Sequence, residues 1–144
     1  MVSEIKSKYV VFKLESNFYG LDVNNVLSIE RVSKITRIPN SPEYMLGLMN
    51  LRGDVIPVID LRLKLGLDIS EVDKNTRVII VNESDNVVGL LVDLSSEVME
   101  IDKDCVDKPP NSGPGNELLE FVDGIGKSSD KLIVLLNLKK ILTN

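Results

Sequence analysis

The sequence predicts a mainly β protein in which two similar β units share one core. Hydrophobic residues make up 43% of the 144 residues, but the chain has no Trp, three Phe and three Tyr. The core must therefore be built from Val, Ile and Leu, which favour strands when they alternate or run together. The aliphatic runs at 78–81 and 133–136 are typical of strands buried on both faces. An internal repeat divides these strands between two units.

The repeat consists of two matched pairs of segments. Residues 40–65 align without gaps with residues 117–142, at a constant offset that superposes a glycine on a glycine (124 − 47 = 77). The earlier segments 9–30 and 77–100 each contain an aliphatic run, a Glu-Ser turn and a second apolar run with a glycine. Two matched segments in the same order indicate a duplication.

The repeat predicts a single domain over 8–144 with two units, one at 9–66 and one at 76–142. A polar connector at 66–75 joins the units, and residues 1–7 form a flexible N-terminus. Units of this size bury little surface alone, so we expect them to share a core, and strands can be exchanged between them. Small closed or nearly closed barrels are the expected solution, because closure removes exposed strand edges.

The elements of the first unit follow from its residues in chain order. A Ser-Asn pair at 16–17 predicts a hairpin turn, and Val26 and Ile29 have the spacing of a helical turn. Pro57 interrupts an aliphatic run and cannot donate to a strand ladder, so it marks an edge, a bulge or a strand end. Asp60 is placed to cap the short helical turn that follows.

The second unit repeats this order with one insertion. A Ser-Asp-Asn run at 84–86 predicts the hairpin turn. An insertion between Glu100 and Leu118, at 102–117, contains Pro109-Pro110 and a Gly-Pro-Gly run, which predict a mobile surface loop. Asn137 occupies the position of Asp60 and is expected to cap a short C-terminal helix.

Charge and composition exclude several classes of function. Seventeen basic and twenty-two acidic residues give a net charge of −5, which argues against binding to nucleic acid or to an anionic membrane surface. Without His, catalysis by Ser-His or Cys-His pairs and the commonest zinc sites are excluded. The single Cys105 cannot form an internal disulfide and reads as a packing residue. The N-terminus lacks a signal-peptide pattern, so we expect a cytoplasmic protein. Because the chain has no His and no carboxylate cluster with ligand spacing, we expect neither a metal nor a cofactor.

Two other kinds of function compete with a protein-binding module. Carboxylates such as Asp54, Asp60 and Asp93 could serve an enzyme, but no cluster has ligand spacing and Asp60 is explained by capping. Binding of peptides or oligosaccharides usually needs exposed aromatic side chains, and most of the six in this chain lie in strand-like positions. We therefore expect a binding module that is not an enzyme.

The densest motif is G-L-M-N-L-R-G-D-V-I-P-V-I-D-L-R at 47–62, accompanied by Y-G-L-D-V at 19–23 and I-T-R-I-P at 35–39. Together these segments resemble the CheW family of chemotaxis coupling proteins, and the resemblance extends from Tyr9 to Leu142. It implies two intertwined SH3-like five-stranded β-barrels with short helical connectors and a short C-terminal helix, in agreement with the repeat.

The resemblance also implies a function. It is that of a signal-transduction adaptor that couples methyl-accepting chemoreceptors to a CheA-type histidine kinase by non-covalent bridging. The partners would be the regulatory domain of the kinase and the cytoplasmic helical tip of the receptor, in membrane-associated receptor arrays and without membrane insertion. Two alternatives stay open, namely a CheW-like scaffold of another signalling assembly and an excised regulatory domain of a larger kinase.

The resemblance assigns six residues to a receptor-binding groove and none to the kinase contact. The six are Val26, Ser28, Gly47, Asn50, Arg52 and Val98. Arg52 is the strongest candidate, because Ser129 is its counterpart in the repeat and the fold therefore does not require a guanidinium there. Gly47 also has a structural interpretation, since Gly124 repeats it, and Val26 fits core packing equally well.

Two further charged positions bear on the groove. Many members of the family carry Glu at the position of Ser28, where it could pair with Arg52, and Glu30 could substitute for it here. Arg62 is matched by Lys139 in the repeat, so we expect a solvated charge near the end of a helical turn.

Overall fold

The computed structural model describes residues 6–109, 117–128 and 130–143. Most of the predicted flexible N-terminus, the Gly-Pro-Gly run of the predicted surface loop and Ser129 lie outside these residues. The first strand already begins at Lys6.

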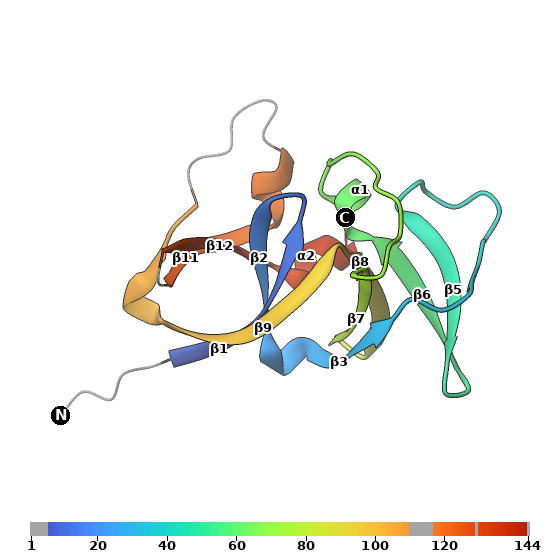
Figure 1. Cartoon of the computed structure of the whole chain (residues 1–144), viewed down its shortest axis with the longest axis horizontal. Coiled ribbons are helices and arrows are strands. Elements are labelled where there is room, and N and C mark those ends of the chain that lie inside the picture. The colour runs from blue at the N-terminus through green and yellow to red at the C-terminus, as the bar shows by residue number, and fades with distance from the viewer. Residues whose placement is uncertain (1–5, 110–116, 129, 144) are drawn as a thin grey trace.

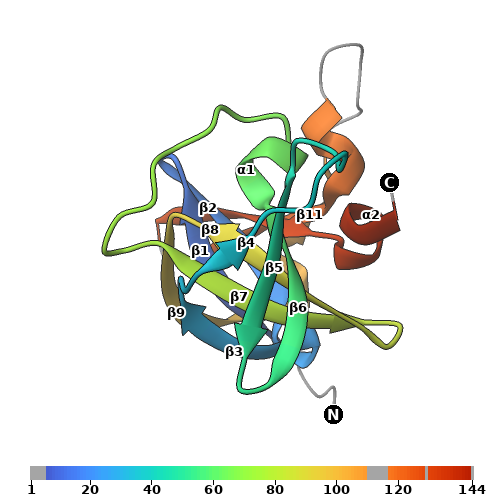
Figure 2. The ribbon, with the colours of Figure 1, turned by 90° about the vertical axis from the view of Figure 1, so that its right-hand side faces the viewer.

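Two six-stranded sheets form the described part of the molecule (Figures 1 and 2). Sheet 1 has the order β10-β11-β12-β2-β1-β9, with β1 (Lys6–Leu14), β2 (Asn17–Asp22), β9 (Leu94–Asp102), β10 (Val106–Asp107), β11 (Val122–Ser128) and β12 (Lys131–Leu136). Sheet 2 has the order β3-β7-β8-β6-β5-β4, with β3 (Val26–Arg31), β4 (Ile35–Thr36), β5 (Met45–Leu51), β6 (Asp54–Asp60), β7 (Arg77–Glu83) and β8 (Asn86–Val92). The helical segments are η1 (Val23–Asn25), α1 (Leu61–Lys64), η2 (Lys103–Cys105), η3 (Glu117–Phe121) and α2 (Leu138–Thr143).

The predicted fold class is confirmed, and the duplication is visible in the strand registers. In sheet 2, Met45 of β5 lies opposite Ile59 of β6, and in sheet 1 Val122 of β11 lies opposite Leu136 of β12. Both pairs follow the offset of 77, and both hairpins carry a bulge directly after them. The two-residue strands β4 and β10 occupy equivalent sheet edges and bring the count in each sheet to six.

Each sheet takes strands from both sequence repeats. Strand β3 of the first repeat pairs with β7 of the second, and β9 of the second pairs with β1 of the first, in the same register and with the same bulge. The chain crosses from sheet 1 to sheet 2 at η1 and returns at Asp93, between β8 and β9. The ranges 9–66 and 76–142 therefore mark the repeats and not the sheets, and the domain division itself stays a prediction.

Val26 and Ile29 lie in a strand, so the predicted helical turn over them is wrong. Their backbone pairs with β7, and a helical turn forms just before them, at η1. The Asp22 carboxylate caps that turn by accepting a hydrogen bond from the Asn24 amide at 2.9 Å. The cap ends β2 and starts the helical turn at η1. Val26 and Ile29 follow this turn and therefore belong to strand β3.

Pro57 lies in an interior strand at a place where only one neighbour is paired. It is opposite Leu48 of β5, whereas the parallel ladder between β6 and β8 begins only at Val58. The missing amide hydrogen of proline therefore removes no bond from that ladder.

One main core joins the two sheets. Its buried side chains come from both sheets, from α1 and from α2, and include Phe12, Leu14, Tyr19, Ile59, Leu61, Ile79, Leu90, Leu136 and Ile141. The two units thus bury their apolar surfaces against each other, as expected for units too small to hold a core alone.

Candidate partner-binding groove

Arg52 lies at the tip of a two-residue turn between β5 and β6. The φ angles of Arg52 and Gly53 are 51° and 91°, so both central residues have the positive φ that two-residue hairpin turns require. The Asn50 side-chain oxygen accepts a hydrogen bond from the Gly53 amide at 3.0 Å and thereby fixes the turn. Asn50 shapes the loop, and the Arg52 side chain stands 74% exposed at its end.

Arg52 pairs with Glu30 of β3, the strand at the other edge of the sheet order. Nη2 of Arg52 lies 3.4 Å from Oε1 of Glu30, whose side chain is only 17% exposed. Many family members carry Glu at the position of Ser28, and here Glu30 contacts the Arg52 guanidinium in its place. Ser28 itself carries no charge. A solvated ion pair of this kind contributes about 0–1 kcal/mol, so the guanidinium can be given up to a partner at little loss of stability.

A groove of about 520 Å³ opens at this end of sheet 2. This surface, called here the Arg52 groove, is lined by Leu27, Ser28, Leu51, Arg52, Asp54, Val55, Ile56, Ile80 and Val87. Its aliphatic side chains Leu27, Val55 and Val87 are exposed to solvent. Clustered exposed aliphatic side chains beside one Arg are typical of protein-binding surfaces.

Four of the six predicted site residues lie elsewhere. Asn50 holds the turn, and Val26 is half-buried and packs against the main core. Gly47 is buried with φ at 146°, and a Cβ atom there would lie 2.1 Å from the carbonyl oxygen of Thr36. Val98 is on β9 of sheet 1. Of the six residues, only Ser28 and Arg52 line the groove. That all six form one receptor site therefore stays a prediction.

Two further exposed aliphatic side chains lie on the two exchanged strands. Ile29 of β3 pairs opposite Ile79 in sheet 2, and Val98 of β9 pairs opposite Val10 in sheet 1 at the equivalent position. Both Ile29 and Val98 are exposed, and Figures 1 and 2 place β3 and β9 on the same side of the molecule. We call Ile29 and Val98 the exchanged-strand surface.

Sequence reasoning missed Ile29 and the exposed aliphatic residues of the Arg52 groove. Val55 begins an aliphatic run, yet its side chain is 64% exposed, and Leu132 at the equivalent place is 63% exposed. The only available signal was the repeat, which aligns the two residues at the start of their strands. Strand ends near a turn leave side chains in solvent even when the sequence reads as a continuous apolar run.

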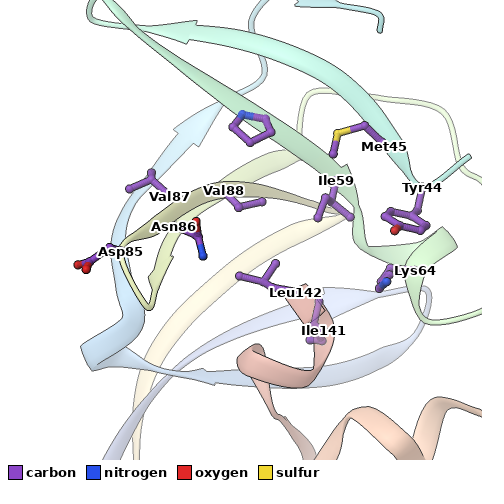
Figure 3. A pocket seen from close by; sticks show the side chains of 11 residues that line it. Tyr44, Met45, Ile59, Lys64, Asp85, Asn86, Val87, Val88, Ile141 and Leu142 are labelled. Carbon is purple, nitrogen blue, oxygen red and sulfur yellow. The ribbon is translucent and has the colours of Figure 1, made fainter. Parts of the chain in front are cut away.

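A further hollow of about 450 Å³ lies between β6, the β7–β8 turn and α2 (Figure 3). It is lined by Tyr44, Met45, Pro57, Ile59, Lys64, Asp85, Asn86, Val87, Val88, Ile141 and Leu142. Nζ of Lys64 lies 4.1 Å from the centre of the Tyr44 ring, a cation–π contact at its rim. Asp85 is the only carboxylate in this lining, so the hollow lacks a pair of acids for general acid–base chemistry.

Arg62 is not the solvated charge that the repeat suggested, and that prediction was wrong. Its side chain is 13% exposed, and Nε lies 2.7 Å from Oδ1 of Asp93 while Nη2 bonds the other carboxylate oxygen. Nη1 lies 3.6 Å from Glu15 and donates to the Asp68 carbonyl at 3.1 Å. Burial raises the pKa of Asp93, but hydrogen bonds from Arg62 and from the Glu15 amide outweigh it and hold that pKa below its usual value.

The two predicted helix caps are formed. An oxygen of Asp60 accepts a hydrogen bond from the Arg62 amide at 3.0 Å, and the Asn137 oxygen accepts one from the Lys140 amide at 3.0 Å. Asp60 is almost fully buried, and this burial raises its pKa although the two capping bonds oppose the change. Capping thus explains this carboxylate without a catalytic role.

Other kinds of site have little support in the described residues. Within ranges 6–109, 117–128 and 130–143, no group of three or more His, Cys, Asp or Glu side chains is placed to hold a metal ion. No helix of this part of the chain is long and apolar enough to span a membrane. Cys105 is half-buried and packs with Ile101 in a small core cluster of sheet 1.

The fold and the exposed surfaces define a β-rich binding module, and comparison with known proteins gives its family. The model of the CheW-like domain matches residues 8–144. The chain therefore belongs to the CheW family.

Individual relatives resemble the chain over nearly its whole length. It is 35% identical to the chemotaxis protein CheW of Helicobacter pylori, over 94% of this chain and 81% of that protein. It is 34% identical to the chemotaxis protein CheW of Bacillus subtilis, over 99% and 92% respectively. The crystal structure of the scaffolding protein TtCheW from Thermoanaerobacter tengcongensis matches with a TM-score of 0.84 and 39% identity, over 92% of this chain and 89% of that chain.

Proposed function

We propose that the chain is a chemotaxis adaptor that couples methyl-accepting receptors to a CheA-type histidine kinase by binding both, without doing chemistry. The observation that carries this proposal is the exposure of aliphatic side chains both at the Arg52 groove and on the exchanged strands of one shared core. The Arg52 groove lies at the end of sheet 2, and the exchanged-strand surface includes residues of both sheets. An adaptor needs two such sites that can be occupied together.

The exchanged-strand surface suits the receptor. The cytoplasmic tip of a methyl-accepting receptor is a helical hairpin, and helices are recognised through apolar anchors at helical spacing. Ile29 and Val98 occupy equivalent positions on strands β3 and β9 and present one exposed aliphatic side chain from each unit. Two equivalent anchors can each contact one helix of a two-helix tip.

We assign the Arg52 groove to the kinase, which departs from the receptor role that the family resemblance implies for Ser28 and Arg52. The regulatory domain of a CheA-type kinase carries the same kind of domain, so it can pack the end of a sheet against the end of sheet 2. Leu27 and Val55 offer aliphatic contacts, and Arg52 can exchange its weak pair with Glu30 for an acceptor on the partner. Arg residues surrounded by apolar contacts are frequent hot spots of protein interfaces.

Each contact can be weak while the assembly is stable. A micromolar dissociation constant corresponds to about −8 kcal/mol, and simultaneous binding in an array raises the effective affinity through local concentration. Recruitment to receptor arrays then follows from the receptor contact. The adaptor sets the geometry in which the states of receptor and kinase are coupled.

The test is a pair of calorimetric titrations with surface variants. We expect Arg52→Glu to weaken binding of the kinase regulatory domain and to leave binding of a receptor tip fragment unchanged. Val98→Asp should do the opposite, and Lys139→Glu, a charge reversal on the exposed face of α2, should change neither. Equal losses for both partners in every variant would contradict the assignment of two separate surfaces.

A further inference from the structure

The ion pair between Arg62 and Asp93 lies where the chain returns from sheet 2 to sheet 1. Arg62 follows β6 of sheet 2, and Asp93 is the connection between β8 and β9. The guanidinium also contacts Glu15 in the β1–β2 turn of sheet 1. Figure 1 shows α1 beside the β1–β2 hairpin turn.

Asp93 joins the same two sheets a second time through the backbone. Its carboxylate accepts a hydrogen bond from the Glu15 amide at 2.8 Å, and its own amide donates to the Lys13 carbonyl at 3.1 Å. One Asp therefore bonds an arginine of α1, directly after β6 of sheet 2, and the hairpin turn of sheet 1. Few other polar side chains described in the structure connect the two sheets in this way.

The duplicated counterpart of this cluster is missing. The offsets of the repeat place Lys139 at the position of Arg62, Asn24 at that of Asp93 and Ser84 at that of Glu15. Lys139 and Asn24 are exposed, and the Ser84 hydroxyl bonds Glu83 instead. In the part of the chain that the structure describes, the Lys139 side chain makes no ion pair. The fold therefore forms this junction on one side only and does not require it on the other.

The pair is better suited to define geometry than to supply stability. Taking a guanidinium and a carboxylate out of water offsets most of their attraction, so buried pairs add little net stability. Hydrophobic attraction in the shared aliphatic core is non-directional and favours burial more than one exact orientation of the sheets. A two-pronged Arg–carboxylate contact is directional and selects one arrangement.

We propose that Arg62 and Asp93 are positioning residues that fix the orientation of sheet 1 relative to sheet 2. The exchanged-strand surface spans both sheets, whereas the Arg52 groove belongs to sheet 2. Fixing the sheets therefore fixes how a bound receptor tip is held relative to a bound kinase domain. This consequence for signalling rests on the proposed function, while the structural part does not.

The first experiment measures the sheets in the free protein. Spin labels at Glu100→Cys on β9 and Asp54→Cys on β6, in a Cys105→Ser background, report the distance distribution between the sheets. Labels at Asp54→Cys and Arg31→Cys, both in sheet 2, provide the control pair. Arg62→Gln should broaden or shift only the distribution between the sheets.

The matched control variant is Lys139→Gln, which removes the same charge at the equivalent place of the repeat. It should leave both distance distributions unchanged. If Arg62→Gln does not fold, Asp93→Asn carries the same test, with Asn24→Asp as its control. An unchanged distribution between the sheets in Arg62→Gln or Asp93→Asn would overturn the proposal, whatever happens to signalling.

The second experiment measures signalling with the receptor tip and the kinase. We expect Arg62→Gln to retain both binary dissociation constants and to lower receptor control of kinase activity by roughly 2- to 30-fold. Arg62→Lys keeps the charge but not the two-pronged contact, so it should show the same loss. Full control with Arg62→Gln would refute the role in coupling. Failure of the unmodified chain to bind either partner would instead refute the proposed function and leave the distance test standing.

Discussion

Replacing Gly47 by Ala is the most demanding test of how the structure explains the Gly-rich motif. The positive φ of 146° is unfavourable for a residue with a side chain, at about 1–3 kcal/mol. The new Cβ atom would also lie 2.1 Å from the backbone oxygen of Thr36, an overlap that a side-chain rotation cannot relieve. Overpacking of this kind costs about 1–3 kcal/mol more. The total, about 2–6 kcal/mol, is a large part of the 5–15 kcal/mol that stabilises a typical domain.

Urea unfolding followed by circular dichroism measures the effect. Gly53→Ala is the control, because Gly53 also has a positive φ, of 91°, but has no atoms within 4 Å of a built Cβ. Gly53→Ala should lower the free energy of unfolding only by the cost of the positive φ, about 1–2 kcal/mol. Gly124 has no positive φ, but a Cβ atom there would lie 2.7 Å from Cγ1 of Val106 and 3.0 Å from the Asp107 carbonyl oxygen, so Gly124→Ala should cost about 1–3 kcal/mol by overpacking alone. A loss for Gly47→Ala no larger than that for Gly53→Ala would refute the reasoning.

Three further predictions concern charge, pH and the core. Arg52→Glu should change the unfolding free energy by less than about 1 kcal/mol, because Arg52 is exposed and its pair with Glu30 is weak; loss of cooperative unfolding would show a structural role instead. Burial raises the folded pKa of Asp60 above its unfolded value, so its ionised form destabilises the fold increasingly as pH rises above about 4. Asp60→Asn, which keeps the cap as Asn137 does, should therefore stabilise the protein at pH 7 more than at pH 3 in urea titrations, and an equal effect at both would contradict this. Phe12→Ala should cost about 3–5 kcal/mol by thermal or urea unfolding, since Phe12 is fully buried; a loss below about 1 kcal/mol would mean that this part of the core is misjudged.

The duplication could be predicted from the sequence because both the residue types and their spacing recur in the two repeats. The offset of 77 reappears in the registers of the two hairpins, including the bulges before Gly47 and Gly124. The caps at Asp60 and Asn137 were equally accessible, since capping is a local interaction of residues two or three apart.

The exchange of strands could not be derived in the same way. An alternating apolar strand such as β3 presents the same pattern whether it pairs within its own repeat or with β7 of the other. Only the three-dimensional path of η1 and of Asp93 decides between these pairings. The position of Val98 on the other sheet from Arg52 follows from this exchange, so the six candidate residues could not be sorted into surfaces beforehand.

Arg62 shows where an internal repeat misleads. Its counterpart Lys139 is exposed, and the two look interchangeable in sequence. The difference lies in partners that are far away in the chain, Asp93 and Glu15, which have no acidic counterparts in the other repeat. Glu30 was easier to anticipate, because it is two residues from the position that the family resemblance had marked.

The most direct test of the adaptor function is a sequential calorimetric titration of both partners. The regulatory domain of a CheA-type kinase is first bound to saturation, and a receptor tip fragment is then titrated into the complex. Two surfaces on one core predict saturable one-to-one binding of the tip to the preformed complex, with an affinity no weaker than for the free chain. Displacement of the kinase domain by the tip, or no binding of either partner near millimolar concentration, would contradict the proposal.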